Sequence, residues 1–412
     1  MSSPYGPEYD DLRQRARAFC RSSWPLAGQE AELPHRQQVI LWQKRAIEAG
    51  LLHRSFPREY GGGGLPQDLR ADMVIKREFA LSDVPYLEST PNGPMFLVPA
   101  LLECGTDEQK AEYIAPTLSG ELDWCQGYSE PNAGSDLASL TSRAELTPDG
   151  WVINGQKIWT SNAHCTNMMF GVFRTEPEEP RHRGVSFLIV PMDTPGIEVR
   201  VIKTMHGVRD DICEVFFDDV RIPADNIIGT RGGGWSVTKS VLKYERLWLA
   251  DTSVVSVQFA HLVELARRTA KRAQINGNPA ILDSDIRQRL SQIEAWAACQ
   301  ETLVDRLMAA ESRGLGEKMA GEMQTGKLLS SKIQESIAEL ALDLIGSDAL
   351  LTPRQQDLTT MQYLPKVVSN GRWLNAYFAS LANTLGGGTS NMQRNAIGEQ
   401  LLGLPRDRRG NQ

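Results

Sequence analysis

The sequence lacks the features that mark several large classes of protein. Basic residues are not in surplus, because 44 Lys and Arg stand against 51 Asp and Glu and the net charge is −7. No dense Lys/Arg cluster is present either, so we expect no nucleic-acid partner. No apolar run reaches the roughly 18 residues that a membrane span needs, and the first residues resemble neither a signal peptide nor an organelle presequence. We therefore expect a soluble protein without membrane insertion.

Cysteine and histidine are also scarce, with six residues of each type. Neither set shows CxxC or another metal-ligand spacing, so the sequence predicts no metal site. Scattered cysteines are typical of reduced thiols in the cytoplasm, which is the location that we expect. The cysteines are Cys20, Cys104, Cys125, Cys165, Cys213 and Cys299, and the histidines are His35, His53, His164, His182, His206 and His261.

What the chain does have is the composition of an ordinary globular protein. Its 412 residues are 41% hydrophobic and 23% charged, enough for two or three domains with cores of their own. Residues 1–122 carry apolar residues at helical spacing, for example Leu12, Ala16 and Phe19, and predict an all-helical domain. The glycine run at 61–64 is predicted to be a turn, because it lacks the Lys-Ser/Thr that follows a phosphate-binding loop.

Residues 123–230 change to the pattern of short strands and turns. Asp-Gly at 149–150 and Asn-Gly at 154–155 are hairpin signals. Strand-like runs follow at 168–174, 185–191, 197–202 and 214–217. Short strands at this spacing predict a small barrel or sandwich, as a second domain.

Residues 231–412 return to long helices with short connections, which predict a helical bundle as the third domain. We expect helices over 236–273, 284–312 and 321–345, a further helix that ends near 381, and a last helix over 390–402. The predicted order is therefore an N-terminal all-α domain, a central β-barrel and a C-terminal four-helix bundle.

One acidic residue stands out on the first of these C-terminal helices. Glu245 has Val241 and Leu242 one turn before it, and Trp248 and Leu249 one turn after it. All four are apolar, so the carboxylate lies on the stripe that a helix normally buries. Desolvation raises the pKa of a carboxylate toward values that are useful to a base. A buried Glu paired with a distant Arg, or one whose head group reaches solvent, would show the same pattern.

Two segments combine small hydroxyl residues with turns at strand ends. Residues 127–137 read GYSEPNAGSDL, and residues 155–162 read GQKIWTSN. Hydroxyl groups, backbone N–H groups and a Trp at the end of a strand suit the edge of a planar, hydrogen-bonding cofactor. By spacing alone, plain turns explain these segments equally well.

Together with three further segments, these motifs resemble the acyl-CoA dehydrogenase family. The further segments are PREYGGGGL at 57–65, FFDDVRIP at 216–223 and GGGTSNMQR at 386–394. All five occur in the family's order over nearly the whole chain. The resemblance implies the three-domain fold given above, FAD as cofactor and assembly as a tetramer.

The resemblance assigns flavin contacts to the β-rich region. Ser129 matches a position where the family uses a hydroxyl against the flavin, and Gln126 and Tyr128 belong to the same strand end. Trp159 and Ser161 match the Trp and the Thr/Ser that pack on the flavin ring and hydrogen-bond to it.

The resemblance also nominates a catalytic base and its neighbours. Many members place a Glu directly before the Gly-Thr of the C-terminal loop, where this sequence has Gly387. A smaller branch, typified by isovaleryl-CoA dehydrogenases, places that Glu on the first long helix of the bundle, just before an Arg. Glu245 and Arg246 occupy this place, which assigns Arg246 to the substrate. Ser135 matches a serine near the pantetheine arm of the CoA ester.

Two further matches depart from the family pattern near the cofactor. Arg272 and Gln274 match residues that reach the FAD of a neighbouring subunit, but the usual Phe-Gly after them is replaced by Ile275 and Asn276. Asp343 stands where the family usually has Gln.

The implied reaction is α,β-dehydrogenation of an acyl-CoA thioester to the 2-enoyl-CoA. Glu245 would take the α-proton while a hydride leaves the β-carbon for flavin N5. The backbone N–H of Gly387 would stabilise the enolate as an oxyanion-hole donor. In this family an electron-transfer flavoprotein usually accepts the electrons.

The C-terminal loop carries a second cofactor expectation. Its glycines precede a predicted helix on which Ser390 and Gln393 have the spacing of a capping box. Close backbone approach and a helix N-terminus suit the pyrophosphate or adenosine part of FAD, which assigns Gly386 and Thr389 to the cofactor. A plain helix start fits the same residues.

Other functions stay open. The chain could be one subunit of a heteromeric dehydrogenase for bulky, for example sterol side-chain, thioesters. The departures at Ile275, Asn276 and Asp343 favour this alternative, and Glu245 opposes a purely inert role. A flavin oxidase or hydroxylase on the same scaffold would differ in the oxygen reactivity of its reduced flavin, and a structural protein would bind no FAD. The acyl group is not determined.

Overall fold

The structure is a computed structural model in which the chain divides into two compact units. The sheet unit comprises Gln14–Asp68 and Val84–Glu245, and the bundle unit comprises Met1–Arg13, Leu69–Asp83 and Arg246–Gln412. The three-domain boundaries predicted from the sequence stay a prediction. The structure describes residues 6–82, 84–85, 91–205, 212–249, 252–269, 278–311, 313, 315, 319–350 and 371–405, with the backbone alone at 246–249, 253, 311, 320 and 371–372.

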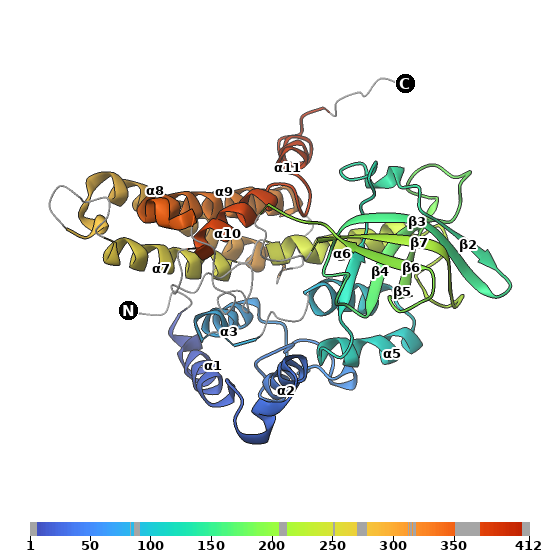
Figure 1. Ribbon diagram of the computed structural model, residues 1–412, viewed down its shortest axis with the longest axis horizontal. Helices are drawn as coiled ribbons and strands as arrows, with labels where there is room; N and C mark the ends of the chain where they lie inside the picture. Colours follow the sequence, from blue (N-terminus) through green and yellow to red (C-terminus); the bar gives the residue numbers. More distant parts are fainter. Residues whose placement is uncertain are drawn as a thin grey trace. The chain divides into compact units, whose positions relative to one another are not determined.

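The sheet unit is built on one eight-stranded sheet in its described part. The strand order is β6-β7-β3-β2-β4-β5-β8, and β1 pairs in parallel with β4. The strands are β1 (Trp124–Gly127), β2 (Arg143–Thr147), β3 (Gly150–Ser161), β4 (Met168–Arg174), β5 (Val185–Pro191), β6 (Ile197–Val201), β7 (Ile212–Ile222) and β8 (Ile227–Ile228). They appear in green in Figure 1.

The core of this sheet unit is formed by buried side chains at alternate positions of the strands. Trp151, Ile153, Phe173 and Val215 are among the residues that pack there with almost no exposed surface. Successive side chains of a strand point to opposite faces, so one face of each strand supplies this core. The pairing of β3 with β7 is irregular between Lys157 and Thr160, and this irregularity determines the position of a site residue described below.

Helices of the same unit precede and follow the sheet in sequence. The helix α5 begins after the N-cap Thr106, which forms a capping box with Gln109. Gln109 Nε2 also donates to the carbonyls of Asp225 and Ile227, at 3.0 and 2.8 Å, and so ties α5 to the segment around β8. The helices that lie wholly or for the larger part in this unit are α1 (Asp10–Ser23), α2 (His35–Glu48), α4 (Val98–Cys104), α5 (Asp107–Leu118) and α6 (Gly234–Leu249).

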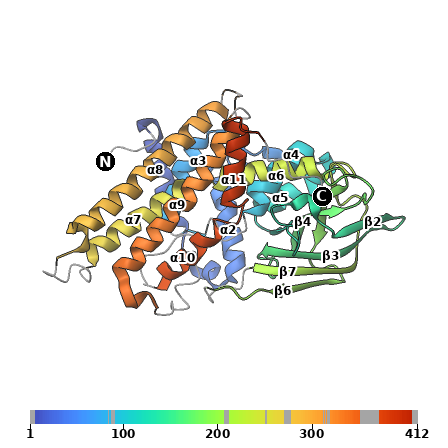
Figure 2. The same cartoon turned by 90° about the horizontal axis from the view of Figure 1, so that it is seen from above.

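The bundle unit contains long helices that run side by side (Figure 1, Figure 2). α9 contacts α7, α8, α10 and α11, and α3 contacts α7. Buried aliphatic residues such as Leu262, Leu290 and Ile337 form its core. The helices are α3 (Leu69–Ser82), α7 (Thr252–Arg268), α8 (Ser284–Glu311), α9 (Ala320–Ile345), α10 (Gly371–Ala382) and α11 (Ser390–Ala396), which continues as a π-helix over Ile397–Leu401.

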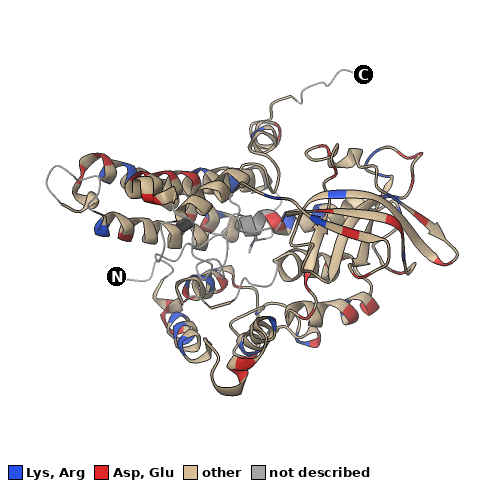
Figure 3. Cartoon of the chain, viewed as in Figure 1, with Lys and Arg blue, Asp and Glu red and all other residues tan. Residues whose placement is uncertain are grey.

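Most predicted helices of this region correspond to observed ones. The single helix predicted over 236–273 corresponds to α6 and α7, and its residues 250–251 and 270–273 lie outside the described residues. Acidic and basic residues alternate along the helices and the sheet in Figure 3, and neither kind is confined to one element. No helix in the described part of the chain is long and apolar enough to cross a membrane.

Candidate active site

The nominated base, Glu245, lies near the end of α6 in the sheet unit. This helix begins at Gly234, where a Cβ would lie 2.5 Å from the backbone N of Phe187, so only glycine allows the helix to start this close to β5. Along the predicted apolar stripe Val241 is fully buried and Leu242 is half-buried. Glu245 itself is half-buried, and Gln126 Nε2 donates to its Oε2 at 3.4 Å. The structure therefore pairs two of the predicted site residues.

Tyr128, the next predicted cofactor residue, faces the interior of the sheet unit. It is 6% exposed, and its ring meets Phe170 and Phe187 edge-on at 6.1 and 6.4 Å. Burial raises the pKa of the Tyr128 phenol well above its usual value, and the negative charge of Glu245 raises it further. Tyr128 therefore stays neutral at any ordinary pH and acts as a packing group behind Gln126 and Glu245.

Trp159 has the opposite character, because it is a large aromatic side chain that is 62% exposed. Its backbone is left-handed, with φ of 60°, at the irregular pairing of β3 with β7. A bulky residue in this conformation is strained, and such strain clusters at functional sites. Ser161, two residues later, is half-buried, and Asn162 is also left-handed, with φ of 62°. The end of β3 thus carries the exposed indole of Trp159 and, two residues later, the hydroxyl group of Ser161.

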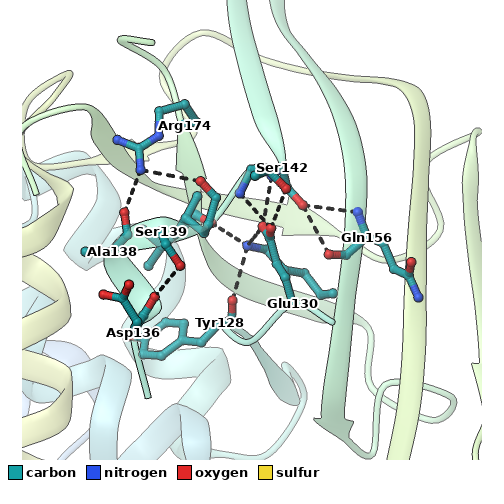
Figure 4. Close-up of polar contacts among 12 residues, drawn as sticks. Tyr128, Glu130, Asp136, Ala138, Ser139, Ser142, Gln156 and Arg174 are labelled. Carbon is teal, nitrogen blue, oxygen red and sulfur yellow. Dashed lines mark hydrogen bonds and ion pairs between the residues drawn. The ribbon is translucent and has the colours of Figure 1, made fainter. Parts of the chain in front are cut away.

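A buried ion pair joins the two motif segments, and sequence reasoning missed it. Lys157 of β3 is fully buried, and its Nζ donates to Glu130 Oε1 at 2.9 Å and to the carbonyls of Tyr128 and Val172. Glu130 also accepts from the backbone N–H groups of Thr141 and Ser142. Figure 4 shows this network around Glu130. The sequence offered one signal for this pair, since Glu130 lies in one family motif and Lys157 lies in the next.

The pKa values of the pair follow from burial and from mutual attraction. Burial alone would raise the pKa of Glu130, but Lys157 and the hydrogen bonds from Thr141 and Ser142 lower it to about 2. Burial lowers the pKa of Lys157 to about 8, although Glu130 counteracts this. Both groups are therefore charged at neutral pH. The pair fixes the segment that carries Ser129, whose carbonyl accepts from the Ile158 N–H at 2.9 Å.

Ser135, assigned to the substrate, lies exposed in the turn that follows this segment. Its neighbour Asp136 pairs with Arg181 of the β4–β5 loop at 3.0 Å. The Ser139 hydroxyl donates to the Asp136 carbonyl at 2.7 Å, and Arg174 donates to the Ala138 carbonyl at 2.7 Å (Figure 4). The turn is held by the Asp136 side chain and by two backbone carbonyls, and the Ser135 side chain stays at the surface.

The C-terminal glycine loop belongs to the bundle unit. Gly387 and Gly388 have φ of 64° and 88°, which favour glycine. The helix α11 begins at Ser390, where the last helix was predicted to start, but its N-cap is Thr389, whose side chain accepts from the Met392 N–H. The predicted capping box is therefore wrong: the Gln393 side chain donates to the Gly387 and Gly388 carbonyls instead. Gly386 and Thr389 lie in this loop as expected.

The remaining predicted residues divide into one that is described and several that are not. Asp343 on α9 accepts from Arg289 Nη1 on α8 at 2.7 Å, so this departure from the family pattern serves an ion pair within the bundle unit.

Among the described residues, no group of three His, Cys, Asp or Glu could hold a metal ion. Outside the described residues lie Arg272, Gln274, Ile275 and Asn276, as does the side chain of Arg246.

Comparisons with known proteins agree over the whole chain. Models of the N-terminal, middle and C-terminal domains of acyl-CoA dehydrogenase match residues 6–121, 125–220 and 232–402. The Mycobacterium tuberculosis protein named acyl-CoA dehydrogenase IpdE1 is 37% identical, covering 98% of this chain and 100% of that protein.

Two solved structures share the fold. The ChsE4-ChsE5 complex from Mycobacterium tuberculosis has a chain that is 27% identical with a TM-score of 0.77, covering 99% of this chain and 100% of its own. The Tcur3481-Tcur3483 steroid ACAD has one that is 26% identical with a TM-score of 0.78, covering 97% and 98%. The predicted fold is confirmed. The chain is an oxidoreductase that belongs to the acyl-CoA dehydrogenase family.

Proposed function

We propose that the chain dehydrogenates an acyl-CoA thioester between its α- and β-carbons, with Glu245 as the base and FAD as the electron acceptor. The observation that carries this proposal is the half-buried carboxylate of Glu245 in contact with Gln126. The loop position where many relatives have their acid is Gly387, which has no side chain. We therefore assign the role of the base to the carboxylate of Glu245 on α6.

The residues at the end of β3 fit a planar cofactor. An indole that is 62% exposed on a strained backbone gains little from packing, whereas stacking on a flat ring would use its face. Trp159 would pack on the isoalloxazine of FAD, and Gln126, Ser129 and Ser161 would supply polar groups at its edge. When bound, FAD supplies the acceptor for the hydride that leaves the β-carbon. Thr389 and Gly386, with Arg272 and Gln274, are proposed for the rest of the cofactor.

The residues of the chain have two tasks in the reaction. The α C–H of a thioester is a weak acid, so the base must be aimed at it and the enolate must be stabilised. Glu245 Oε2 takes the α-proton, and Gln126 Nε2 orients this carboxylate. The backbone N–H of Gly387 donates to the thioester oxygen as negative charge develops there. Arg246 and Ser135 are proposed to bind the CoA ester.

A heteromeric enzyme is the second candidate, and the relatives favour it. Two similar structures carry names that pair two chains, the ChsE4-ChsE5 complex and the Tcur3481-Tcur3483 steroid ACAD. The second name also favours a bulky, steroid-derived acyl group for this chain. In either case we propose an electron-transfer flavoprotein as the acceptor of the electrons and a tetramer as the assembly.

The first prediction tests the base through the colour of the protein. The chain, expressed alone, is titrated anaerobically with a panel of straight, branched and steroid-type acyl-CoA thioesters, beside Glu245→Gln. We expect a yellow protein that is bleached by at least one thioester. The Gln variant should keep the colour, with its rate of flavin reduction lowered by about 10²-fold or more, because an amide cannot take the proton.

Three results separate the alternatives. A colourless protein that turns yellow on co-expression with a second dehydrogenase chain supports the heteromer. A yellow protein whose Glu245→Gln variant is bleached as fast as wild type removes Glu245 from the mechanism. A yellow protein that is bleached by no thioester contradicts the dehydrogenase activity itself.

A further inference from the structure

Two buried side chains from two helices hold the backbone of the loop Gly386–Gly388. Lys327 lies on α9 and Gln393 on α11, and they are only 3% and 4% exposed. Lys327 Nζ donates to the Gly388 carbonyl at 2.9 Å. Gln393 Nε2 donates to the Gly387 carbonyl at 3.0 Å and to the Gly388 carbonyl at 3.3 Å. Two consecutive carbonyls are therefore bound from the interior of the bundle unit.

These bonds restrict the peptide group that carries the Gly387 N–H. The peptide unit is a rigid plane, so its orientation is set by the dihedral angles on either side. On the preceding side, the Gly386 N–H donates to the Ala382 carbonyl at 3.0 Å. On the following side, Gln393 and Lys327 bind the Gly387 and Gly388 carbonyls. Within the described part of the chain the Gly387 N–H has no acceptor of its own, so it remains available to a ligand.

The loop needs such external support because its own sequence is flexible. Three successive glycines have the widest choice of backbone conformations, and Gly387 and Gly388 use left-handed values of φ. A Cβ on Gly388 would lie 2.8 Å from Gln393 Nε2, so the amide is packed directly against the loop. The ammonium of Lys327 adds a charge-assisted bond, which is shorter and stronger than a neutral one.

We propose that Lys327 and Gln393 are positioning residues that aim the Gly387 N–H at the thioester oxygen of the substrate. The inference rests on the proposed function in one respect, namely that this N–H stabilises the enolate. Neither side chain touches substrate; each acts through the carbonyl that it binds. Loss of either donor lets the glycine loop sample other conformations, and the N–H then meets the oxygen only part of the time.

The test removes each donor from the flavin-loaded protein. Lys327→Met and Gln393→Met keep the length of the side chain without its N–H groups. The matched control is Lys332→Met on the same helix, where an exposed Lys lies over the Trp296 ring at 5.7 Å and does not contact the loop. We expect kcat for flavin reduction to fall about 10- to 100-fold in the first two variants with little change in KM, as for a misplaced catalytic group. The control should retain the wild-type rate.

A second measurement distinguishes a misoriented Gly387 N–H from a general structural defect. A 3-ketoacyl-CoA has an acidic α-proton, and absorbance against pH gives the pKa of this ligand when it is bound. We expect Lys327→Met and Gln393→Met to raise that pKa, by about one unit for each tenfold loss of enolate stabilisation. Gly388→Ala should do the same from within the loop, because its Cβ displaces the Gln393 amide.

The outcomes distinguish this inference from the function on which it rests. Wild-type protein that no acyl-CoA reduces overturns the proposed function. Wild-type protein that is reduced, with Lys327→Met and Gln393→Met equal to it in rate and in ligand pKa, overturns the positioning role alone. Slower reduction with an unchanged ligand pKa also overturns it, since that pattern reports a structural defect.

Discussion

At the scale of single residues, Trp159 shows how strain and exposure together identify a site. An exposed Trp on an ordinary strand would carry little information, because apolar atoms make up much of any protein surface. Trp159 is exposed and also left-handed, at an irregularity of the sheet. A side chain that is 62% exposed gains little from packing to offset the cost of that conformation, and a ligand that uses the indole would account for it.

Trp159→Gly should therefore separate stability from cofactor binding. Glycine adopts φ of 60° without strain, so we expect the free energy of unfolding of the flavin-free protein to stay equal or to rise by about 1 kcal/mol. FAD affinity should fall about tenfold or more, because the stacking surface is gone. Urea unfolding and flavin fluorescence measure the two quantities.

The matched control for this prediction is Asn162→Gly. Asn162 has the same left-handed backbone, with φ of 62°, but no aromatic ring. It should show a similar effect on unfolding and unchanged FAD affinity. Undiminished FAD binding by Trp159→Gly would contradict the assignment of the indole to the flavin.

At the scale of elements, α6 is held on two sides. On one side Gln126 of β1 contacts Glu245. On another side Glu103, the second-last residue of α4, accepts from the hydroxyls of Ser240 and Tyr244, the latter at 2.6 Å. Burial would raise the pKa of Glu103, but these two donors and Lys243 lower it. One carboxylate thus links α4 to the turn of α6 that leads into Glu245.

Glu103→Ala should loosen this end of α6. The contact is partly exposed, so we expect a loss of only about 1 kcal/mol in the free energy of unfolding. Flavin reduction by acyl-CoA should slow by a few-fold, about 3- to 10-fold, since the helix that carries the base gains freedom. Glu103→Gln keeps one acceptor and should lie between wild type and Ala. A Glu103→Ala protein with a wild-type rate would show that Glu103 has no part in orienting Glu245.

At the scale of the whole molecule, the buried Glu130–Lys157 pair governs how stability depends on pH. The folded-state pKa of Glu130, about 2, lies below its usual value of 4.5. The contribution of the ionised pair is therefore complete between about pH 4.5 and the pKa of Lys157, about 8, and it is lost as the pH falls toward 2. Because the pair connects β3 with the segment that follows β1 and with the Val172 carbonyl of β4, its loss affects several parts of the sheet unit.

Lys157→Met should be strongly destabilising at neutral pH. It leaves the carboxylate of Glu130 buried without its cation, which costs about 3–5 kcal/mol in comparable buried pairs. Without Lys157, burial raises the pKa of Glu130, so this carboxylate is protonated at a higher pH in the variant than in wild type. The deficit should therefore shrink as the pH falls from neutral toward 2, and denaturant unfolding over this range measures it. The double variant Glu130→Gln/Lys157→Met should recover part of the loss. A deficit that does not vary with pH would contradict the ionised pair.

Much of the fold could be predicted because its signals are short-range. The apolar periodicity of α8 and α9 depends on residues within a few positions of each other, and both helices appear where they were predicted. The choice between two adjacent hydroxyl residues, Thr389 and Ser390, was wrong by one position. Either could cap the helix, and the backbone of the glycine loop decides between them.

The sequence by itself determined the order of helices and strands, the family and the residue types at the candidate site, because local periodicity and contiguous motifs carry that information. Only the tertiary structure decided which of these residues meet. Gln126 and Glu245 are 119 positions apart, and Glu130 and Lys157 are 27 apart. Contacts at such separations depend on strand register and on where a helix starts, which no local pattern specifies. The same reason hid the roles of Lys327 and Gln393, because a hydrogen bond to a backbone carbonyl has no signature in the sequence.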